Sequence, residues 1–225
     1  MLQIRHNYIS VGYAGTPSYG GSQMRASSKA MREVGCGAVA ALDLLIYLDR
    51  WHAKQPCGFF RQAAEDGVID ADEYNELLQR LSRRFFPIIP KFGINGLMLA
   101  GGLNAFFIRY ALPFRATWGL GSRHIFEQIE SMLRQDIPVI LAVGPNFPLF
   151  WQKNNLTFYA RTRAGVLGPV CGIHAHYVTV TGIDEQRLHI SSWGREYYIE
   201  REEYLSYIRK HSGSIVSNIV RIRQL

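Results

Sequence analysis

The sequence predicts an α+β protein in which a mostly helical N-terminal half precedes a mostly antiparallel β-sheet. Residues 38–48 (AVAALDLLIYL) are strong helix formers with almost no polar face, which is typical of a buried helix. Residues 122–135 carry their apolar side chains at the spacing of an amphipathic helix. From residue 176 onward, apolar and polar residues alternate, which is typical of strands.

We expect a single domain over residues 1–225, with a helical subdomain at about 30–135 and a sheet subdomain at about 136–225. A chain of 225 residues, of which 48% are hydrophobic, is long enough to bury a substantial core. The sequence contains no internal repeat and no low-complexity tract. These properties indicate an ordinary globular protein.

The charged residues argue against a nucleic-acid-binding protein. The net charge of +7 comes from 25 Lys and Arg against 18 Asp and Glu. The cations are scattered, with only short pairs such as Arg83–Arg84 and Arg209–Lys210, so we expect a solvated basic surface and no nucleic-acid partner.

No targeting or membrane segment is evident. The first ten residues, MLQIRHNYIS, lack the charged and apolar regions of a signal peptide, so the sequence predicts a cytoplasmic protein. The longest uncharged run, Phe92–Ile108, is shorter than the ~20 residues of a spanning helix and contains several Gly and Asn residues. We therefore expect no membrane span.

Helix signals dominate the N-terminal half. Residues 10–30 are rich in Gly, Ser and Tyr, which indicates an irregular approach to the buried helix. Asp70 is placed to cap a second helix, with Glu73 completing a capping box. Ser122 is the expected cap of the amphipathic helix. The other elements expected here are a Gly-rich helix at 94–108 and a short strand at 111–118.

Strand signals dominate the C-terminal half. The expected elements are a buried strand at 136–144, strands at 176–183, 187–193 and 195–200, a helix at 200–210 and a last strand at 214–223. Aromatic residues are frequent between 147 and 159. They belong either to a loop that guides or occludes a substrate or to ordinary loop packing.

Cys36 is the first candidate for chemistry. The three cysteines, Cys36, Cys57 and Cys171, cannot all pair with one another, so we expect at least one free thiol. Cys36 lies between Gly35 and Gly37 directly before the buried helix, where the helix dipole favours a thiolate and lowers the pKa. A cysteine in such a turn is also often a small core residue. Cys171 precedes no helix, and we expect it to be structural or to line a loop.

A reactive thiol needs an imidazole partner, and His176 begins the most regular strand of the sequence. His174 is the alternative on the same strand face, and either histidine is also compatible with an ordinary strand end. The next strand ends in the sequence SSWG at 191–194. Because adjacent antiparallel strands lie side by side, this end is expected near His176, where Trp193 would shield the orienting hydrogen bond from water.

Three segments, GCGA at 35–38, HYVTVTG at 176–182 and SSWG at 191–194, together resemble the papain-like cysteine peptidase fold. The sequence is most similar to bacterial peptidases related to the bacteriocin-leader-processing (double-glycine peptidase-like) domain. The resemblance covers most of the chain in order and spacing. It implies that Cys36 is the nucleophile and His176 is the base.

Two positions depart from the family's pattern. The family has Asn-Ser-Trp-Gly where this chain has SSWG, so the resemblance assigns Ser191 as the residue that orients His176. The family also carries an oxyanion glutamine shortly before the cysteine, where this chain has Ala30. Gln23 lies 13 residues before Cys36 and would serve only if the intervening run folds back, which the spacing argues against.

The sequence therefore favours a cysteine peptidase or amide hydrolase acting on a peptide or protein substrate. Two alternatives stay open. One is a degenerate papain-like module that binds a peptide or partner without cutting it, and the other is an acyltransferase that uses the same Cys and His. No cofactor is expected, and no metal, because Cys171, His174 and His176 have no matching Cys or His pair at zinc spacing.

Overall fold

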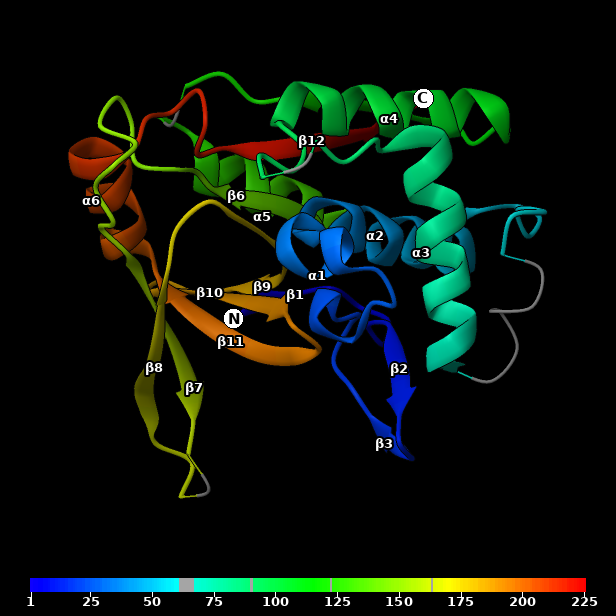
Figure 1. Cartoon of the computed structure of the whole chain (residues 1–225), viewed down its shortest axis with the longest axis horizontal. Helices are drawn as coiled ribbons and strands as arrows, with labels where there is room; N and C mark the ends of the chain where they lie inside the picture. Colours follow the sequence, from blue (N-terminus) through cyan, green and yellow to red (C-terminus); the bar gives the residue numbers. More distant parts are fainter. Residues whose placement is uncertain (61–66, 90, 122, 163) are drawn as a thin grey trace.

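The structure is a computed structural model that describes residues 1–60, 67–89, 91–121, 123–162 and 164–225 (Figure 1). It confirms the α+β class, with helices packed on a large antiparallel sheet. Within these residues the sheet has nine strands. Their spatial order is β5 (Phe114–Trp118), β12 (Ile219–Gln224), β6 (Val139–Val143), β9 (His176–Ile183), β10 (Arg187–Ser192), β11 (Arg195–Glu200), β7 (Leu156–Arg161) and β8 (Leu167–Ile173), and β1 (Leu2–Gln3) also pairs with β9.

A second, small sheet contains two short strands within residues 10–30, a segment that the sequence predicted to be irregular. Its central strand, β2 (Ser10–Tyr13), pairs antiparallel with β3 (Thr16–Pro17) and parallel with β4 (Val68–Asp70). It lies beside the helices and does not join the large sheet (Figure 1).

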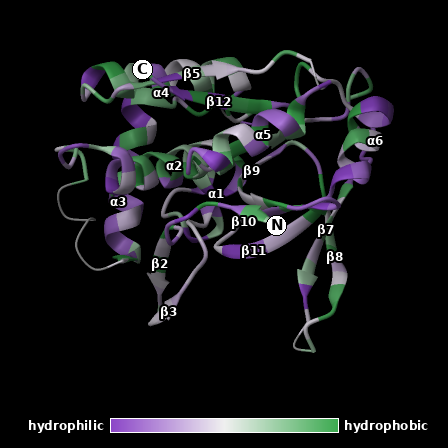
Figure 2. Ribbon diagram, turned by 180° about the vertical axis from the view of Figure 1, so that it is seen from behind, coloured by the Kyte–Doolittle hydropathy of each residue, from purple (hydrophilic) through white to green (hydrophobic). Residues whose placement is uncertain are grey.

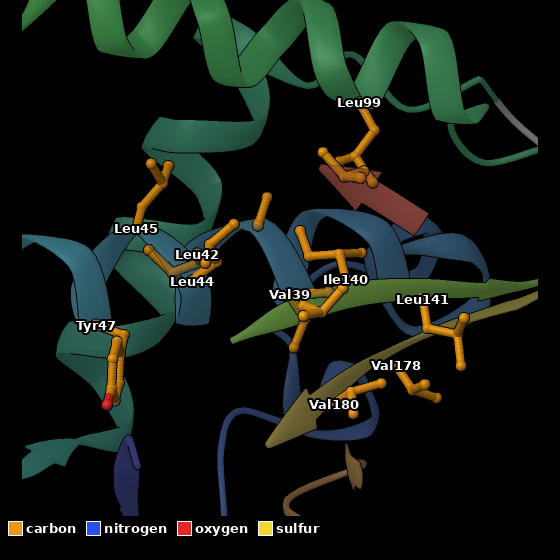
Figure 3. Close-up of a cluster of buried hydrophobic side chains, with 14 of the residues drawn as sticks. Val39, Leu42, Leu44, Leu45, Tyr47, Leu99, Ile140, Leu141, Val178 and Val180 are labelled. Carbon is orange, nitrogen blue, oxygen red and sulfur yellow. The ribbon is translucent and has the colours of Figure 1, made fainter. Parts of the chain in front are cut away.

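The buried helix is α2 (Cys36–His52), which packs against β6 and β9 of the large sheet. Its residues from Gly37 to Asp49 are all buried. Figure 3 shows Val39 of α2 beside Ile140 of β6, with Val180 of β9 nearby. Burying each aliphatic side chain of this kind contributes about 1.5–3 kcal/mol to the stability of the fold. The largely apolar pattern thus places α2 between the sheet and the other helices.

The expected cap at Asp70 is confirmed, and Asn95 is a further cap that the sequence analysis did not name. The carboxylate of Asp70 accepts the backbone N–H groups of Asp72 and Glu73, at 2.8 and 3.3 Å. Asn95 caps the Gly-rich helix through the N–H of Met98. Ser122 lies outside the described residues. The helices are η1 (Gln23–Arg25), α1 (Lys29–Val34), α3 (Ala71–Phe85), α4 (Gly96–Arg109), α5 (Ile125–Arg134) and α6 (Arg201–His211).

Helices cover both faces of the large sheet. Helix α5 contacts β6 and β9, as α2 does, but from the opposite face, as the front and back views show (Figures 1 and 2). Figure 2 also shows that α3 is mostly hydrophilic along its outer side, whereas α2 is mostly hydrophobic. In the described ranges, no helix combines the length and the apolar character needed to cross a bilayer.

The division into a helical and a sheet half is less strict than the sequence suggests. Strand β5 lies within residues 30–135 but belongs to the large sheet, because it pairs with the C-terminal strand β12 from Trp118↔Val220 to Phe114↔Gln224. The aromatic segment 147–159 is also only partly a loop. Its last residues begin β7, which forms a long hairpin with β8.

Candidate active site

The sequence-predicted site residues all line one small pocket where helix and sheet meet. Cys36 is the first residue of α2 and His176 is the first residue of β9. Gln23, Ser191 and Trp193 line the same pocket. The pocket encloses about 20 Å³, which is room for roughly one water molecule. In the described part of the chain, no direct hydrogen bond joins the thiol of Cys36 to the ring of His176.

The ring of His176 is fixed on two sides. Its Nε2 atom lies 2.8 Å from Oγ of Ser192. The indole of Trp193 stacks on the imidazole, with ring centroids 4.7 Å apart and planes 27° apart. When Nε2 carries the ring proton and donates a hydrogen bond to Oγ of Ser192, Nδ1 keeps a lone pair that can accept a proton. The ring is therefore held in one orientation by Ser192 and Trp193.

Ser192 holds His176, and this corrects the assignment of Ser191. The hydroxyl of Ser191 instead donates to the backbone carbonyl of Tyr19, at 2.7 Å. The pairing of β10 with β9 shifts register between His189 and Ile190. Because neighbouring strand residues point to opposite faces, such a shift changes which serine faces the histidine.

The turn that carries Trp193 has a constrained backbone. Trp193 and Gly194 link β10 to β11 as a two-residue turn, and both have positive φ, at 50° and 75°. Positive φ at both positions is the geometry of tight hairpins and normally selects Asn or Gly. A bulky residue in this conformation costs free energy. The stacking on His176 and the packing against Phe158 offset that cost.

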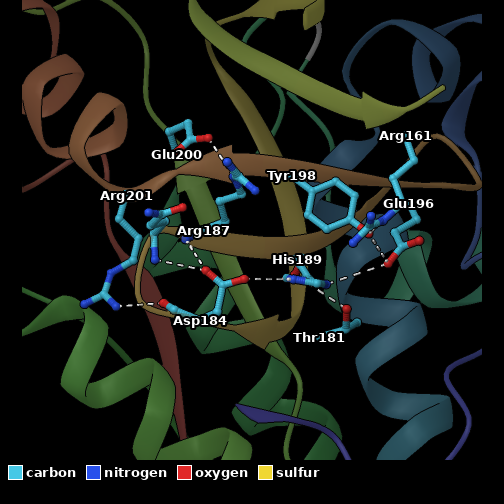
Figure 4. A network of polar contacts seen from close by, with 10 residues as sticks. Arg161, Thr181, Asp184, Arg187, His189, Glu196, Tyr198, Glu200 and Arg201 are labelled. Atoms are coloured by element: carbon cyan, nitrogen blue, oxygen red, sulfur yellow. Dashed lines mark hydrogen bonds and ion pairs between the residues drawn. The ribbon is translucent and has the colours of Figure 1, made fainter. Parts of the chain in front are cut away.

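A polar network ties the two strands of this hairpin together (Figure 4). The ring nitrogens of His189 lie 3.5 Å from a carboxylate oxygen of Asp184 and 3.8 Å from one of Glu196. Nε of Arg187 lies 2.7 Å from Glu200 across the strand pair. Cross-strand contacts of this kind stabilise the pairing and so keep the turn in place.

Burial shifts the pKa of the Cys36 thiol in the direction opposite to the one that the sequence predicted. Burial raises the pKa of the Cys36 thiol above its usual value, although backbone amides of Tyr177 and Gly37 favour the thiolate. The helix dipole alone predicted the opposite direction. Gly37 of α2 lies at a close contact with its neighbours. A Cβ there would lie 2.5 Å from Ile94 and 3.2 Å from Tyr177, so this glycine allows α2 to pack closely on β9.

Burial also keeps the histidine neutral. It lowers the pKa of His176 to about 4. At pH 7 the site therefore rests as a neutral thiol beside a neutral imidazole.

Gln23 lines the small pocket, although its distance from Cys36 along the sequence predicted otherwise. The run between Gln23 and Cys36 folds into η1 and α1, which returns the glutamine to the pocket. The Nε2 atom of Gln23 donates to the carbonyl of Arg32, at 3.0 Å. An amide NH₂ group has two hydrogens, so one is left for a substrate oxygen.

Asp43 is a buried acid beside the site that the sequence analysis did not single out. One of its oxygens accepts the backbone N–H of Gly21 at 2.9 Å and the hydroxyl of Tyr8 at 3.3 Å, and the other accepts the hydroxyl of Tyr74 at 2.7 Å. Burial raises the pKa of Asp43 to about 6. These bonds hold the segment that leads to Gln23. A charged residue inside an otherwise apolar helix was the available sequence signal.

An open groove runs past the small pocket. It encloses about 770 Å³ and shares Gln23, His176 and Trp193 with the pocket. His174 lies in this groove, where its Nδ1 is 2.8 Å from the side-chain oxygen of Asn155. An extended chain in the groove would therefore lie against His176, which also lines the small pocket that contains Cys36.

The two remaining cysteines do not line the small pocket. Cys57 is buried, with its backbone N–H bonded to Asp49. Cys171 is half-buried on β8, opposite Phe158, and starts no helix. Across the residues that the structure describes, no group of three or more His, Cys, Asp or Glu is arranged to hold a metal ion.

Comparisons with models of protein families, with curated proteins and with solved structures each found no match. Function is therefore inferred from the site's own residues and geometry.

Proposed function

We propose that the protein is a thiol-dependent amide hydrolase, of the cysteine peptidase type, with Cys36 as nucleophile and His176 as general base and acid. One observation carries the proposal. The helix-terminal Cys36 and the Ser192-bonded His176 line the same pocket at the edge of an open groove. A nucleophile, a base and an orienting group in this order are the parts that acyl transfer to sulfur requires.

In the first step, Sγ of Cys36 attacks the carbonyl carbon of an amide while its proton passes to Nδ1 of His176. The carbonyl oxygen of the amide gains negative charge and accepts hydrogen bonds from the backbone N–H of Cys36 and from the second side-chain N–H of Gln23. His176 then protonates the leaving amine as the C–N bond breaks, which leaves a thioester. Water, deprotonated by His176, attacks the thioester, releases the acid and restores the thiol.

The test is the cleavage of a random peptide library, followed by mass spectrometry. Wild type and Cys171→Ala, the control for a second thiol, should both cut the library. Cys36→Ala should not cut it, while its melting temperature stays close to that of wild type. Equal cleavage by Cys36→Ala would remove Cys36 as the nucleophile.

A binding module that does not cut is the second candidate. The raised pKa of Cys36 and the absence of a thiol–imidazole hydrogen bond in the described residues favour it. Iodoacetamide labelling separates the two functions. In a hydrolase, Cys36 labels faster at pH 7 than Cys171, and His176→Ala removes the difference. In a binding module, His176→Ala leaves the labelling rate of Cys36 unchanged.

A further inference from the structure

We propose that the open groove beside His176 binds acidic peptide segments. Acidic peptides are then the substrate class of the proposed hydrolase. The role of the groove in cleavage rests on the proposed function, whereas peptide binding does not depend on it. The groove has two walls. Residues of η1 and α1 form one, and residues of β8, the start of β9, the turn after β10 and β11 form the other.

Three exposed arginines lie along these walls. Arg25 and Arg32 belong to the helical wall, and Arg195 belongs to the sheet wall. The guanidinium of Arg25 lies 5.4 Å from the ring centroid of Tyr13, and Arg32 donates to the backbone carbonyls of Ala26 and Ser27. Among the described residues, none of the three has a carboxylate within ion-pair distance.

Glu33 is the acidic residue that lines the groove, and it forms no ion pair with these three arginines among the described residues. The carboxylate of Glu33 lies 3.8 Å from Nζ of Lys29. Three arginines therefore face the groove against one glutamate that already has a cation. A guanidinium offers parallel N–H donors that match a carboxylate, so an Asp or Glu side chain is a complementary ligand.

The position of the groove favours a peptide over a nucleic acid. It shares Gln23, His176 and Trp193 with the small pocket, so a bound chain lies against groups that act on an amide carbonyl. One face of the Trp193 ring is already covered by His176, which limits its use as a base-stacking platform. Three arginines are also fewer cations than a groove that follows a phosphate backbone uses.

The test uses Cys36→Ala, which cannot form a thioester, so that binding is measured without turnover. The immobilised protein is incubated with a random decapeptide library, and the retained peptides are sequenced. We expect Asp and Glu to be enriched over the input library, and we expect the enrichment to fall as salt is raised. Retained peptides with no excess of Asp and Glu would overturn the proposal.

Two matched double variants locate the effect. Arg25→Gln with Arg195→Gln removes one cation from each wall and should weaken binding of a selected acidic peptide about fivefold, as expected for two exposed ion pairs. Arg83→Gln with Arg223→Gln changes the net charge equally on α3 and β12 and should leave the affinity unchanged. Equal losses in the two variants would contradict the proposal.

The same experiment distinguishes the two proposals. If wild type cuts no library peptide but Cys36→Ala retains acidic ones, the hydrolase fails and the acidic groove stands. If wild type cuts peptides without acidic preference, the groove proposal fails alone. If an equal concentration of oligo(dT) displaces the selected peptide, and the same arginines are needed for this, the groove binds nucleic acid and the acidic-peptide proposal is overturned.

Discussion

His176 is clamped between Ser192, whose Oγ lies 2.8 Å from its Nε2 atom, and the indole of Trp193, whose ring centroid lies 4.7 Å from that of the imidazole. The clamp fixes the ring plane and engages Nε2, so that Nδ1 has no hydrogen-bond partner among the residues that the structure describes. Both clamping residues come from the end of β10 and the turn that follows it. The hairpin therefore decides how the imidazole of His176 is oriented.

Ser192→Ala should reduce cleavage by about 10- to 100-fold, because an unoriented imidazole loses part of the acceleration that general acid–base catalysis supplies. Ser191→Ala is the matched control. Its hydroxyl binds the carbonyl of Tyr19, so we expect a stability loss of about 1 kcal/mol and a much smaller change in rate. Initial rates on a selected library peptide measure both effects. A larger loss in Ser191→Ala would restore Ser191 as the orienting residue.

Trp193→Asn should raise the pKa of His176 from about 4 towards 6.5, because the indole contributes to the burial of the ring. Asparagine tolerates positive φ, so the turn is expected to survive the change. The pKa is read from the ring-proton NMR shifts as pH is varied. Trp51→Asn is the control, since Trp51 stacks on His6, with centroids 4.3 Å apart. It should leave the titration of His176 where it was, and a pKa near 4 in Trp193→Asn would exclude the indole as the cause.

His176 should make the protein less stable in acid. Its folded pKa of about 4 lies below the ordinary value of 6.5, so between these values the unfolded chain binds more protons. Its contribution to stability is complete above pH 6.5 and is lost as pH falls towards 4. The difference amounts to at most about 3 kcal/mol.

Urea unfolding of wild type and His176→Gln at several pH values isolates this contribution. The free energy of unfolding of wild type should fall relative to that of the variant between pH 6.5 and 4. The comparison is needed because the raised pKa of Asp43 acts in the opposite direction over part of this range. Parallel pH curves for the two proteins would show that His176 does not titrate with a lowered pKa.

Gly20→Ala should destabilise the segment that leads to Gln23. Gly20 has φ of +80°, and a Cβ there would lie 2.3 Å from Oγ of Ser191 and 2.8 Å from a carboxylate oxygen of Asp43. Gly15→Ala is the matched control, because Gly15 has φ of +77° with nothing within 4 Å of an added Cβ. The control should cost about 1–2 kcal/mol for the backbone alone. Gly20→Ala should cost more, and equal losses of stability in urea would show that the contact with Ser191 and Asp43 is unimportant.

The sequence alone determined the features that depend on neighbouring residues. The apolar run predicted the buried helix α2, Asp70 predicted the start of α3, and strict alternation predicted β9. Cys36 at a helix start and His176 at a strand start were visible for the same reason, because local spacing sets where an element begins.

Tertiary structure alone decided the features that depend on distant pairing and on burial. Because of a register shift between β9 and β10, Ser192 and not Ser191 contacts the ring of His176. The fold of η1 and α1 places Gln23 in the pocket. Burial by segments far apart in the chain reversed the expected pKa of Cys36. Strand pairing and desolvation are sums over non-local contacts, and no local pattern of residues encodes them.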